Sequence, residues 1–293
     1  MRATKNPKIP EGINASEDNP LHEFALLLAG VSGILIVVVV VLSLLVEVLV
    51  SFVPFRWEQK VTGYYEQNLV SDDLVSVVSE VEHAFNLAEF SIAELGEKLA
   101  NQAGLPDEMT VSFHLMEEAA PNAFATIGGH IFVTTGLLQE VSSENALAMV
   151  LAHEIGHIVH RHPIQALSRG VLLQLLLSLI TGNQDSAVLQ SVLGQTGLLT
   201  ILRFNRDMEH EADVKAVSVL TKRYGHLKGA NEFFQSMSEN SEAEWQVVFQ
   251  THPGVESRID FINASAGEIE FSDMNVVGLD ERIGQYLVLQ EML

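Results

Sequence analysis

The sequence of 293 residues predicts a mainly helical α+β domain with a small β-sheet, preceded by one N-terminal transmembrane helix. Three observations support this fold class. An uncharged apolar run covers residues 24–46, and helical patterns fill most of the remaining chain. Only two short segments, residues 111–115 and 131–135, have strand character. The length allows one sizeable soluble domain plus an anchor.

The N-terminal part predicts a membrane anchor. Residues 1–23 form a polar tail that contains Pro and Gly, and the next 23 residues carry no charge. At 1.5 Å per residue, such a run crosses a hydrocarbon core of about 30 Å. It lacks a polar face and a small-residue cleavage site, which disfavours a buried core helix and a signal peptide. We therefore expect an anchor over residues 24–50, and Pro54 ends it.

The sidedness of this anchor follows from a small charge difference. Lys and Arg balance on the two sides within about 20 residues, and only Arg2, farther out, favours an N-terminus inside. The domain would then lie across the membrane, which in a Gram-negative bacterium is the periplasmic side of the inner membrane.

The composition excludes several kinds of site and partner. The chain has no Cys, which excludes disulfides, thiolate ligands and a catalytic Cys. The formal net charge of −22 argues against binding to nucleic acid, which would repel an acidic domain. It suits basic or unfolded polypeptide substrates.

A helix and two strands are expected next along the chain. Apolar residues at helical spacing run from residue 71 or 72 to 103, with Gly104 as C-cap. Residues 111–115 alternate as a strand, and residues 131–135 are β-branched and aromatic. We expect the second of these to be an edge strand near the site, able to pair with the main chain of a peptide.

The most informative segment is His153-Glu154-Ile155-Gly156-His157, which follows an apolar run. Ser143 and Glu144 are N-cap and first-turn signals, and Pro163 closes the helical pattern. Residues four apart lie on one face of a helix, so the two imidazoles can bind one metal ion. Glu154 lies beside them, where a carboxylate can take a proton from the attacking water.

A second apolar stretch covers residues 167–180. It is too short to span a membrane, and we expect a hairpin that flanks the site. Residues 181–200 are rich in Gly, Gln and Ser and are expected to form a mobile cover. His160 and His162 are expected at the surface or in support of the metal ligands.

A third ligand is expected from the acidic segment at residues 206–213, which opens another helical pattern. Glu209 and Asp213 are four apart and share a face. Glu209 can ligate the metal, and Asp213 can accept a hydrogen bond from a ligand His. Glu211 is two positions from Glu209, about 200° away around the helix, and is expected to be a bystander.

Four motifs in order resemble one family of zinc metallopeptidases. It includes the heat-shock protease HtpX, the CAAX prenyl proteases and the BepA-like and Oma-like proteases. The motifs are Asn122-Ala123-Phe124-Ala125 with the Gly128–Leu138 segment, His153–His157, Glu209-x-x-Ala212-Asp213, and Thr251-His252-Pro253-x-x-x-x-Arg258-Ile259. The resemblance covers residues 121–259 and implies a zincin-type metalloprotease fold.

The resemblance also implies roles for residues outside the helical motif. Asn122, Ala123, Phe124 and Ala125 would hold the substrate backbone. His252 would lie near the metal, where it stabilises the oxyanion or occupies the open metal position at rest. Arg258 would orient nearby carboxylates or the intermediate, and a structural salt bridge is the equal alternative.

We therefore expect a membrane-anchored zinc endopeptidase with one Zn²⁺ per chain, held by His153, His157 and Glu209. Its expected role is quality control of envelope proteins. The metallopeptidase domain would cover residues 55–265, with an acidic C-terminal segment at 266–293. A zinc-stabilised, chaperone-like binding module with little turnover is the alternative. Processing of prenylated proteins is a weaker third hypothesis, because resemblance to the CAAX-type proteases would require a multi-helix chamber, which one spanning segment cannot build.

Overall fold

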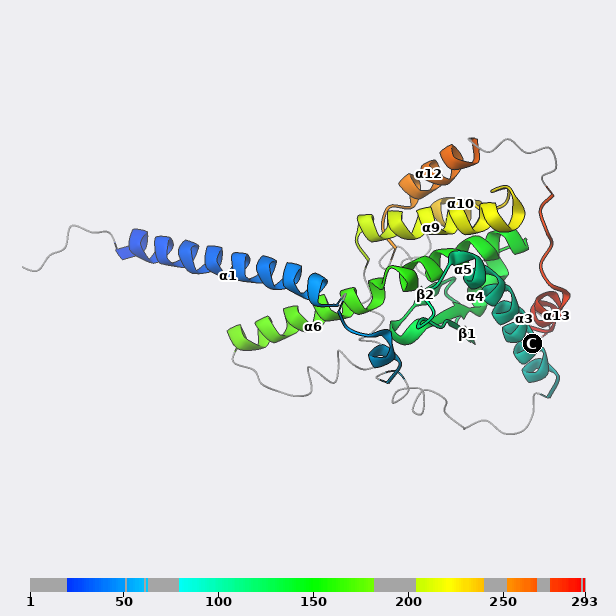
Figure 1. Ribbon diagram of the computed structural model, residues 1–293, viewed down its shortest axis with the longest axis horizontal. Coiled ribbons are helices and arrows are strands. Elements are labelled where there is room, and N and C mark those ends of the chain that lie inside the picture. The colour runs from blue at the N-terminus through cyan, green and yellow to red at the C-terminus, as the bar shows by residue number, and fades with distance from the viewer. Residues whose placement is uncertain are drawn as a thin grey trace, which may run out of the picture. The chain divides into compact units, whose positions relative to one another are not determined.

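The computed structural model describes residues 20–50, 52–60, 62, 79–181, 204–239, 252–267, 275–290 and 292 (Figure 1). The chain divides into two compact units, Met1–Leu45 and Val46–Leu293.

Helix α1 (Pro20–Val50) covers the residues of the expected anchor, 24–50, and begins four residues before them. Most of its apolar side chains are exposed; Ile34, for example, has 68% of its surface accessible. Among the described residues, this is one helix long and apolar enough to cross a membrane, over Leu21–Val50. A helix with so many exposed Ile, Val and Leu side chains has the composition of a membrane span.

The second unit is mainly helical and has one small sheet. Its helices are α3 (Ser79–Ala103), α4 (Thr135–Glu140), α5 (Glu144–Val159), α6 (His162–Thr181), α9 (Arg206–Tyr224), α10 (Glu232–Glu239), α12 (Val255–Gly267) and α13 (Glu281–Gln290). Its strands are β1 (Ser112–Met116), β2 (Ala123–Ala125) and β3 (His130–Thr134), and the 3-10 turn η1 (Ile127–Gly129) links β2 to β3. This agrees with the predicted α+β class.

The sheet has the order β1-β3-β2, with β1 parallel and β2 antiparallel to β3. The prediction that residues 131–135 form an edge strand is therefore wrong, because β3 is central. β2 is the strand at the edge near the motif helix: the N–H of Ala125 donates to Glu154. Residue alternation predicts a strand but carries no information about its neighbours, which distant contacts decide.

Helix α5 is the centre of the unit and lies between the sheet and α9 (Figure 1). Every residue from Asn145 to Ile158 is buried, so the helix is enclosed on all sides, as its mostly apolar sequence requires. Ser143 caps it, its hydroxyl accepting from the N–H of Ala146 at 3.1 Å. Helix α3 also packs on α5 and ends at Ala103, followed by Gly104 at φ 69°, as predicted.

Two expectations about the segment after α5 are corrected. Residues 167–180 lie in one continuous helix, α6, and do not form a hairpin. Pro163 is in the first turn of α6, a position where Pro needs no N–H partner, so it marks a helix start as well as the end of α5. The expected cover at residues 181–200 lies outside the described residues except for Thr181.

The last described residues pack into the domain core. Ile283 and Tyr286 of α13 are buried, and the Tyr286 ring meets Phe85 of α3 edge-to-face. The N–H of Val277 donates to the Asn145 side chain at the start of α5. This part of the predicted C-terminal segment therefore supports the helix that carries the motif.

Candidate metal centre

The two motif histidines face each other from successive turns of α5. The Nε2 atoms of His153 and His157 lie 2.9 Å apart, and both side chains are buried. The i, i+4 spacing and the buried position of α5 together fix this geometry. Two imidazole nitrogens therefore meet inside the domain.

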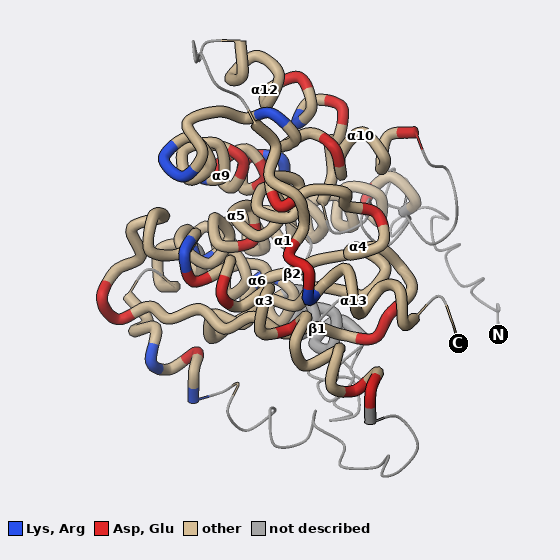
Figure 2. Tube along the Cα trace, turned by 90° about the vertical axis from the view of Figure 1, so that its right-hand side faces the viewer, with Lys and Arg blue, Asp and Glu red and all other residues tan. Residues whose placement is uncertain are grey.

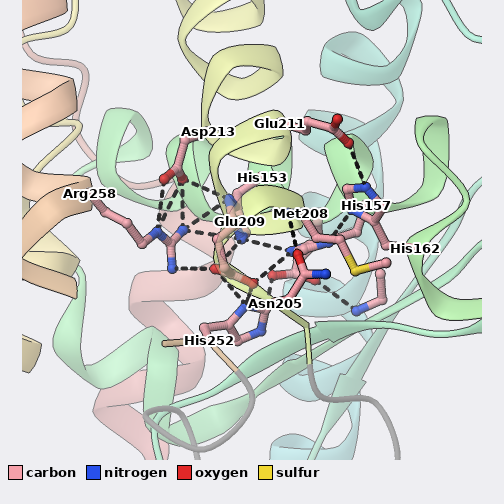
Figure 3. A network of polar contacts seen from close by, with 12 residues as sticks. His153, His157, His162, Asn205, Met208, Glu209, Glu211, Asp213, His252 and Arg258 are labelled. Atoms are coloured by element: carbon pink, nitrogen blue, oxygen red, sulfur yellow. Dashed lines mark hydrogen bonds and ion pairs between the residues drawn. The ribbon is translucent and has the colours of Figure 1, made fainter. Parts of the chain in front are cut away.

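Glu209 comes to this point from the first turn of α9. Asn205 caps α9, its side chain accepting from the N–H of Met208 at 2.9 Å. The carboxylate oxygens of Glu209 then lie 3.5 Å from the Nε2 atoms of His153 and of His157 (Figure 3). The structure thus brings together the three residues predicted as ligands, from two helices that are distant in sequence.

His252, just before α12, completes the cluster. Its Nδ1 lies 3.1 Å from Glu209, and its Nε2 lies 3.8 Å from Glu154. That buried Nε2 has no hydrogen-bond partner. Ligand atoms of His153, His157, Glu209 and His252 all lie within 4.8 Å of one another, a spacing that can hold a metal ion. Three imidazoles and a carboxylate are ligand types that suit zinc, and the unpaired nitrogen shows that hydrogen bonds within the protein do not satisfy every polar atom of the cluster.

Glu154 is buried beside the cluster and points towards β2. Its Oε2 accepts from the N–H of Ala125 at 2.8 Å. Burial raises the pKa of Glu154, although His252 and His153 act in the opposite direction. A carboxylate with a raised pKa is a better proton acceptor at neutral pH than an ordinary Glu.

Asp213 and Arg258 contact His153 and each other beside the ligand cluster. His153 Nδ1 lies 2.9 Å from Asp213, and the Arg258 guanidinium contacts Asp213 at 2.9 Å and Glu209 at 3.1 Å. Arg258 also lies over the ring of Phe234, 4.3 Å from its centroid. A fully charged Arg between two buried carboxylates fixes the orientation of both.

The electrostatics of the site favour a bound cation. Burial raises the pKa of Glu209, but His252 and Arg258 outweigh it and hold that pKa well below its usual range. Burial and Arg258 lower the pKa of His153, whereas hydrogen bonds to Asp213 and Glu209 raise it to about 9. Burial lowers the pKa of His157. The carboxylates therefore attract positive charge to His153, as a proton or as a metal ion.

His157 contacts His162 on the side away from Glu209, and His162 in turn contacts Glu211. His157 Nδ1 lies 2.9 Å from His162 Nδ1, and His162 Nε2 lies 3.0 Å from Glu211 (Figure 3). His162 is buried, which lowers its pKa to about 4. Glu211 is outside the ligand cluster, as expected, yet it ends this chain. Phe204 stacks on His157 at 3.9 Å between centroids, a contact that no sequence motif indicated.

The predicted substrate-binding segment lies at the edge of the sheet beside the cluster. Ala123 lines a small pocket together with His153, Glu154 and His252. The Asn122 N–H donates to Thr134 on β3, and Phe124 stacks on Phe132. Asn122 and Phe124 thus hold β2 in the sheet, while Ala123 and the main-chain N–H of Ala125 border the site.

The acidic composition is spread over the domain. Figure 2 shows Asp and Glu positions on several helices, with fewer Lys and Arg positions. The formal net charge of the chain is −22, and a negative field of this kind favours the approach of a cation.

The chain is similar to several curated proteins. It is 27% identical over 202 residues to the mitochondrial metalloendopeptidase OMA1 of Schizosaccharomyces pombe, which covers 67% of this chain and 59% of that protein. It is 27% identical over 184 residues to the beta-barrel assembly-enhancing protease of Escherichia coli, and this match covers 57% of this chain and 37% of that protein. It is 24% identical over 232 residues to the mitochondrial metalloendopeptidase OMA1 of Homo sapiens, and this match covers 69% of this chain and 44% of that protein. The matches therefore span less than two thirds of each relative.

The family comparison covers the whole site described above. The model of peptidase family M48 matches residues 86–266, from the middle of α3 to the end of α12. This range is more than half of the chain and includes each predicted metal ligand. The chain therefore belongs to peptidase family M48.

Proposed function

We propose that this protein is a membrane-anchored, zinc-dependent endopeptidase that cleaves peptide bonds in polypeptide substrates. The observation that carries the proposal is the convergence of His153, His157 and Glu209, with Glu154 buried beside them. Membership of a peptidase family supports the same activity. A Zn²⁺ ion held by these three residues would polarise the scissile carbonyl and lower the pKa of water towards about 7.

Glu154 is the proposed general base. Its raised pKa and its position within the cluster allow it to take a proton from the attacking water and to pass it to the leaving amine. Asp213 holds His153 through Nδ1, which leaves Nε2 directed to the metal position. His252 is the proposed donor to the oxyanion, because its Nε2 is buried, unpaired and close to Glu154.

The substrate is proposed to bind along β2. This strand has β3 on one side, and Ala123 and the main-chain N–H of Ala125 border the site. Pairing with an extended peptide would place a scissile bond next to Glu154 without requiring a particular sequence. Such binding suits an enzyme that acts on many unfolded proteins, as in protein quality control.

The membrane location rests on α1. We propose that its 31 residues anchor the protein by a single span, with the domain on the periplasmic side of a bacterial inner membrane. The relatives include proteases named for mitochondria and for the assembly of β-barrels, which supports a role in membrane or envelope quality control.

The Glu154→Gln variant tests the function. The amide keeps the size of the side chain but cannot accept the proton, so zinc should stay bound at one ion per chain. Cleavage of casein should fall by about 10²–10⁴-fold, the usual contribution of a general base. Glu97→Gln, an exposed Glu on α3, is the matched control and should cleave at the wild-type rate. Unchanged cleavage by Glu154→Gln would refute the mechanism, whereas normal function of that variant in cells would favour a binding module.

A further inference from the structure

A second group of metal-ligating side chains lies beside the catalytic cluster. His160, His162 and Glu211 have ligand atoms within 4.8 Å of one another. His162 Nε2 is 3.0 Å from Glu211 Oε2, and His160 Nδ1 is 3.9 Å from the same oxygen. Figure 3 shows Glu211 and His162 apart from Glu209 and His252. The group is distinct from the catalytic ligands, although His162 contacts one of them.

The backbone between α5 and α6 creates this group. Arg161 has φ 58°, a left-handed conformation that is unfavourable for a residue other than Gly. Its guanidinium turns to Glu58 and to the carbonyls of Val50 and Val53, which hold the conformation. The imidazoles of His160 and His162, on either side of Arg161, both approach Glu211. Strained backbone of this kind is often associated with a functional site.

We propose that His160, His162 and Glu211 form a second metal site that takes a divalent cation of the zinc class. Two imidazoles and a carboxylate are ligands typical of Zn²⁺, whereas Mg²⁺ and Ca²⁺ prefer oxygen ligands alone. Tetrahedral bonds of about 2.1 Å place ligand atoms about 3.4 Å apart, close to the distances observed here.

The exposure of the site also suits reversible binding of an ion. The side chains of His160 and Glu211 are 35% and 55% exposed, which gives access from solvent and room for water as a further ligand. Burial lowers the pKa of His160, which favours the neutral imidazole that a metal ligand requires. Fewer ligands and greater exposure make this site weaker than the buried cluster.

The second ion is coupled to the catalytic one through the contact between His157 and His162. Their Nδ1 atoms are 2.9 Å apart, a hydrogen bond that needs one proton. An ion on the Nε2 of His157 leaves its Nδ1–H as the donor to His162. An ion on the Nε2 of His162 would likewise leave the proton of His162 on its Nδ1. Two N–H groups, one from each imidazole, would then face each other. Filling the second site therefore breaks the bond that orients His157, and the second ion inhibits.

Ion counting tests the site without any measurement of activity. The detergent-solubilised full-length protein is dialysed against increasing free Zn²⁺, and bound zinc is measured by atomic absorption. Wild type should bind two ions per chain, one tightly and one weakly. His160→Gln should lose the weak ion and keep the tight one, and so should Glu211→Gln. His210→Gln, which removes an exposed imidazole next to Glu211, is the control and should bind two.

Two further measurements separate the sites and test the coupling. Glu209→Ala should lose the tight ion and keep the weak one, so a failure of the proposed catalytic site is distinguishable from a failure of this inference. Excess Zn²⁺ should slow wild-type cleavage of casein by about tenfold, the lower end of the effect of losing a partner of a ligand His. His160→Gln should resist this inhibition.

Three results would overturn the proposal. A single ion in wild type at every zinc concentration would exclude the site, and two ions in His160→Gln would place the second ion elsewhere. Two ions without slower cleavage by the wild type would refute the inhibitory coupling. Mg²⁺ serves as the chemical control and should neither bind at the group nor inhibit.

Discussion

A methyl group added to Gly156 would lie 2.9 Å from the Cα of Ala212 and 3.0 Å from its carbonyl oxygen. Gly156 lies between the two motif histidines on α5, and Ala212 follows Glu209 by three residues on α9. The two smallest side chains therefore lie where α5 and α9 come closest. This close approach allows Glu209 to reach the imidazoles of His153 and His157.

We expect Gly156→Ala to weaken both stability and zinc binding. The added methyl group must push α9 away from α5, and overpacking of this kind costs about 1–3 kcal/mol. Chemical denaturation monitored by circular dichroism measures the first effect, and zinc competition with a chelator measures the second. Gly284→Ala is the control, because a methyl group there meets nothing within 4 Å. Equal zinc affinity in Gly156→Ala and wild type would contradict this account.

The identity of the third ligand can be decided by metal content. Glu209 lies 3.5 Å from both motif imidazoles, whereas Glu211 contacts His162. Glu209→Ala should lose the tightly bound zinc and the activity together, and Glu211→Ala should retain the tightly bound zinc. Metal analysis of the two purified variants after dialysis at low free zinc checks this. The reverse pattern would overturn the assignment.

Zinc binding should depend on pH because a proton and the metal compete for His153. In the metal-free protein the pKa of His153 is raised to about 9. Protonated His153 therefore stabilises the folded state below the usual pKa of histidine, and this contribution to the free energy of unfolding is lost as the pH rises through about 9. A ligand His must be neutral, so binding at pH 7 should release about one proton. The apparent zinc affinity should rise about tenfold per pH unit from 7 to 9.

Isothermal titration calorimetry in two buffers of different ionisation enthalpy counts the released protons. Asp213→Asn is the matched variant, because it replaces the charged acceptor that helps to raise the pKa of His153 with a neutral amide. That variant should release fewer protons at pH 7 than wild type. An affinity that does not change between pH 7 and 9 would show that His153 is already neutral.

His252 can be tested by its removal. Its buried Nε2 is unpaired and lies near Glu154, so we expect it to donate to the oxyanion. His252→Ala should keep zinc and lower kcat by about 10²–10³-fold, as for the loss of one oxyanion donor. Steady-state kinetics on a fluorogenic peptide measure this. Faster cleavage by His252→Ala would instead support a side chain that blocks the metal at rest.

The sequence alone was sufficient for features that depend on local spacing. The pairing of His153 with His157 follows from the helical repeat, because four residues are about one turn whatever surrounds the helix. The placement of Glu209 and Asp213 on one face follows from the same repeat. The apolar helix at residues 24–50 follows from length and composition.

Only the tertiary structure decided features that depend on contacts between distant segments. β3 is central, and the strand beside Glu154 is β2, a three-residue segment whose residues carry no strand signal in the sequence. The contact of His162 with His157, and the stacking of Phe204, depend on the left-handed turn at Arg161 and on where α9 begins. Periodicity specifies which face of an element is apolar, but the partner of that face is chosen by packing across the whole core, which no local pattern contains.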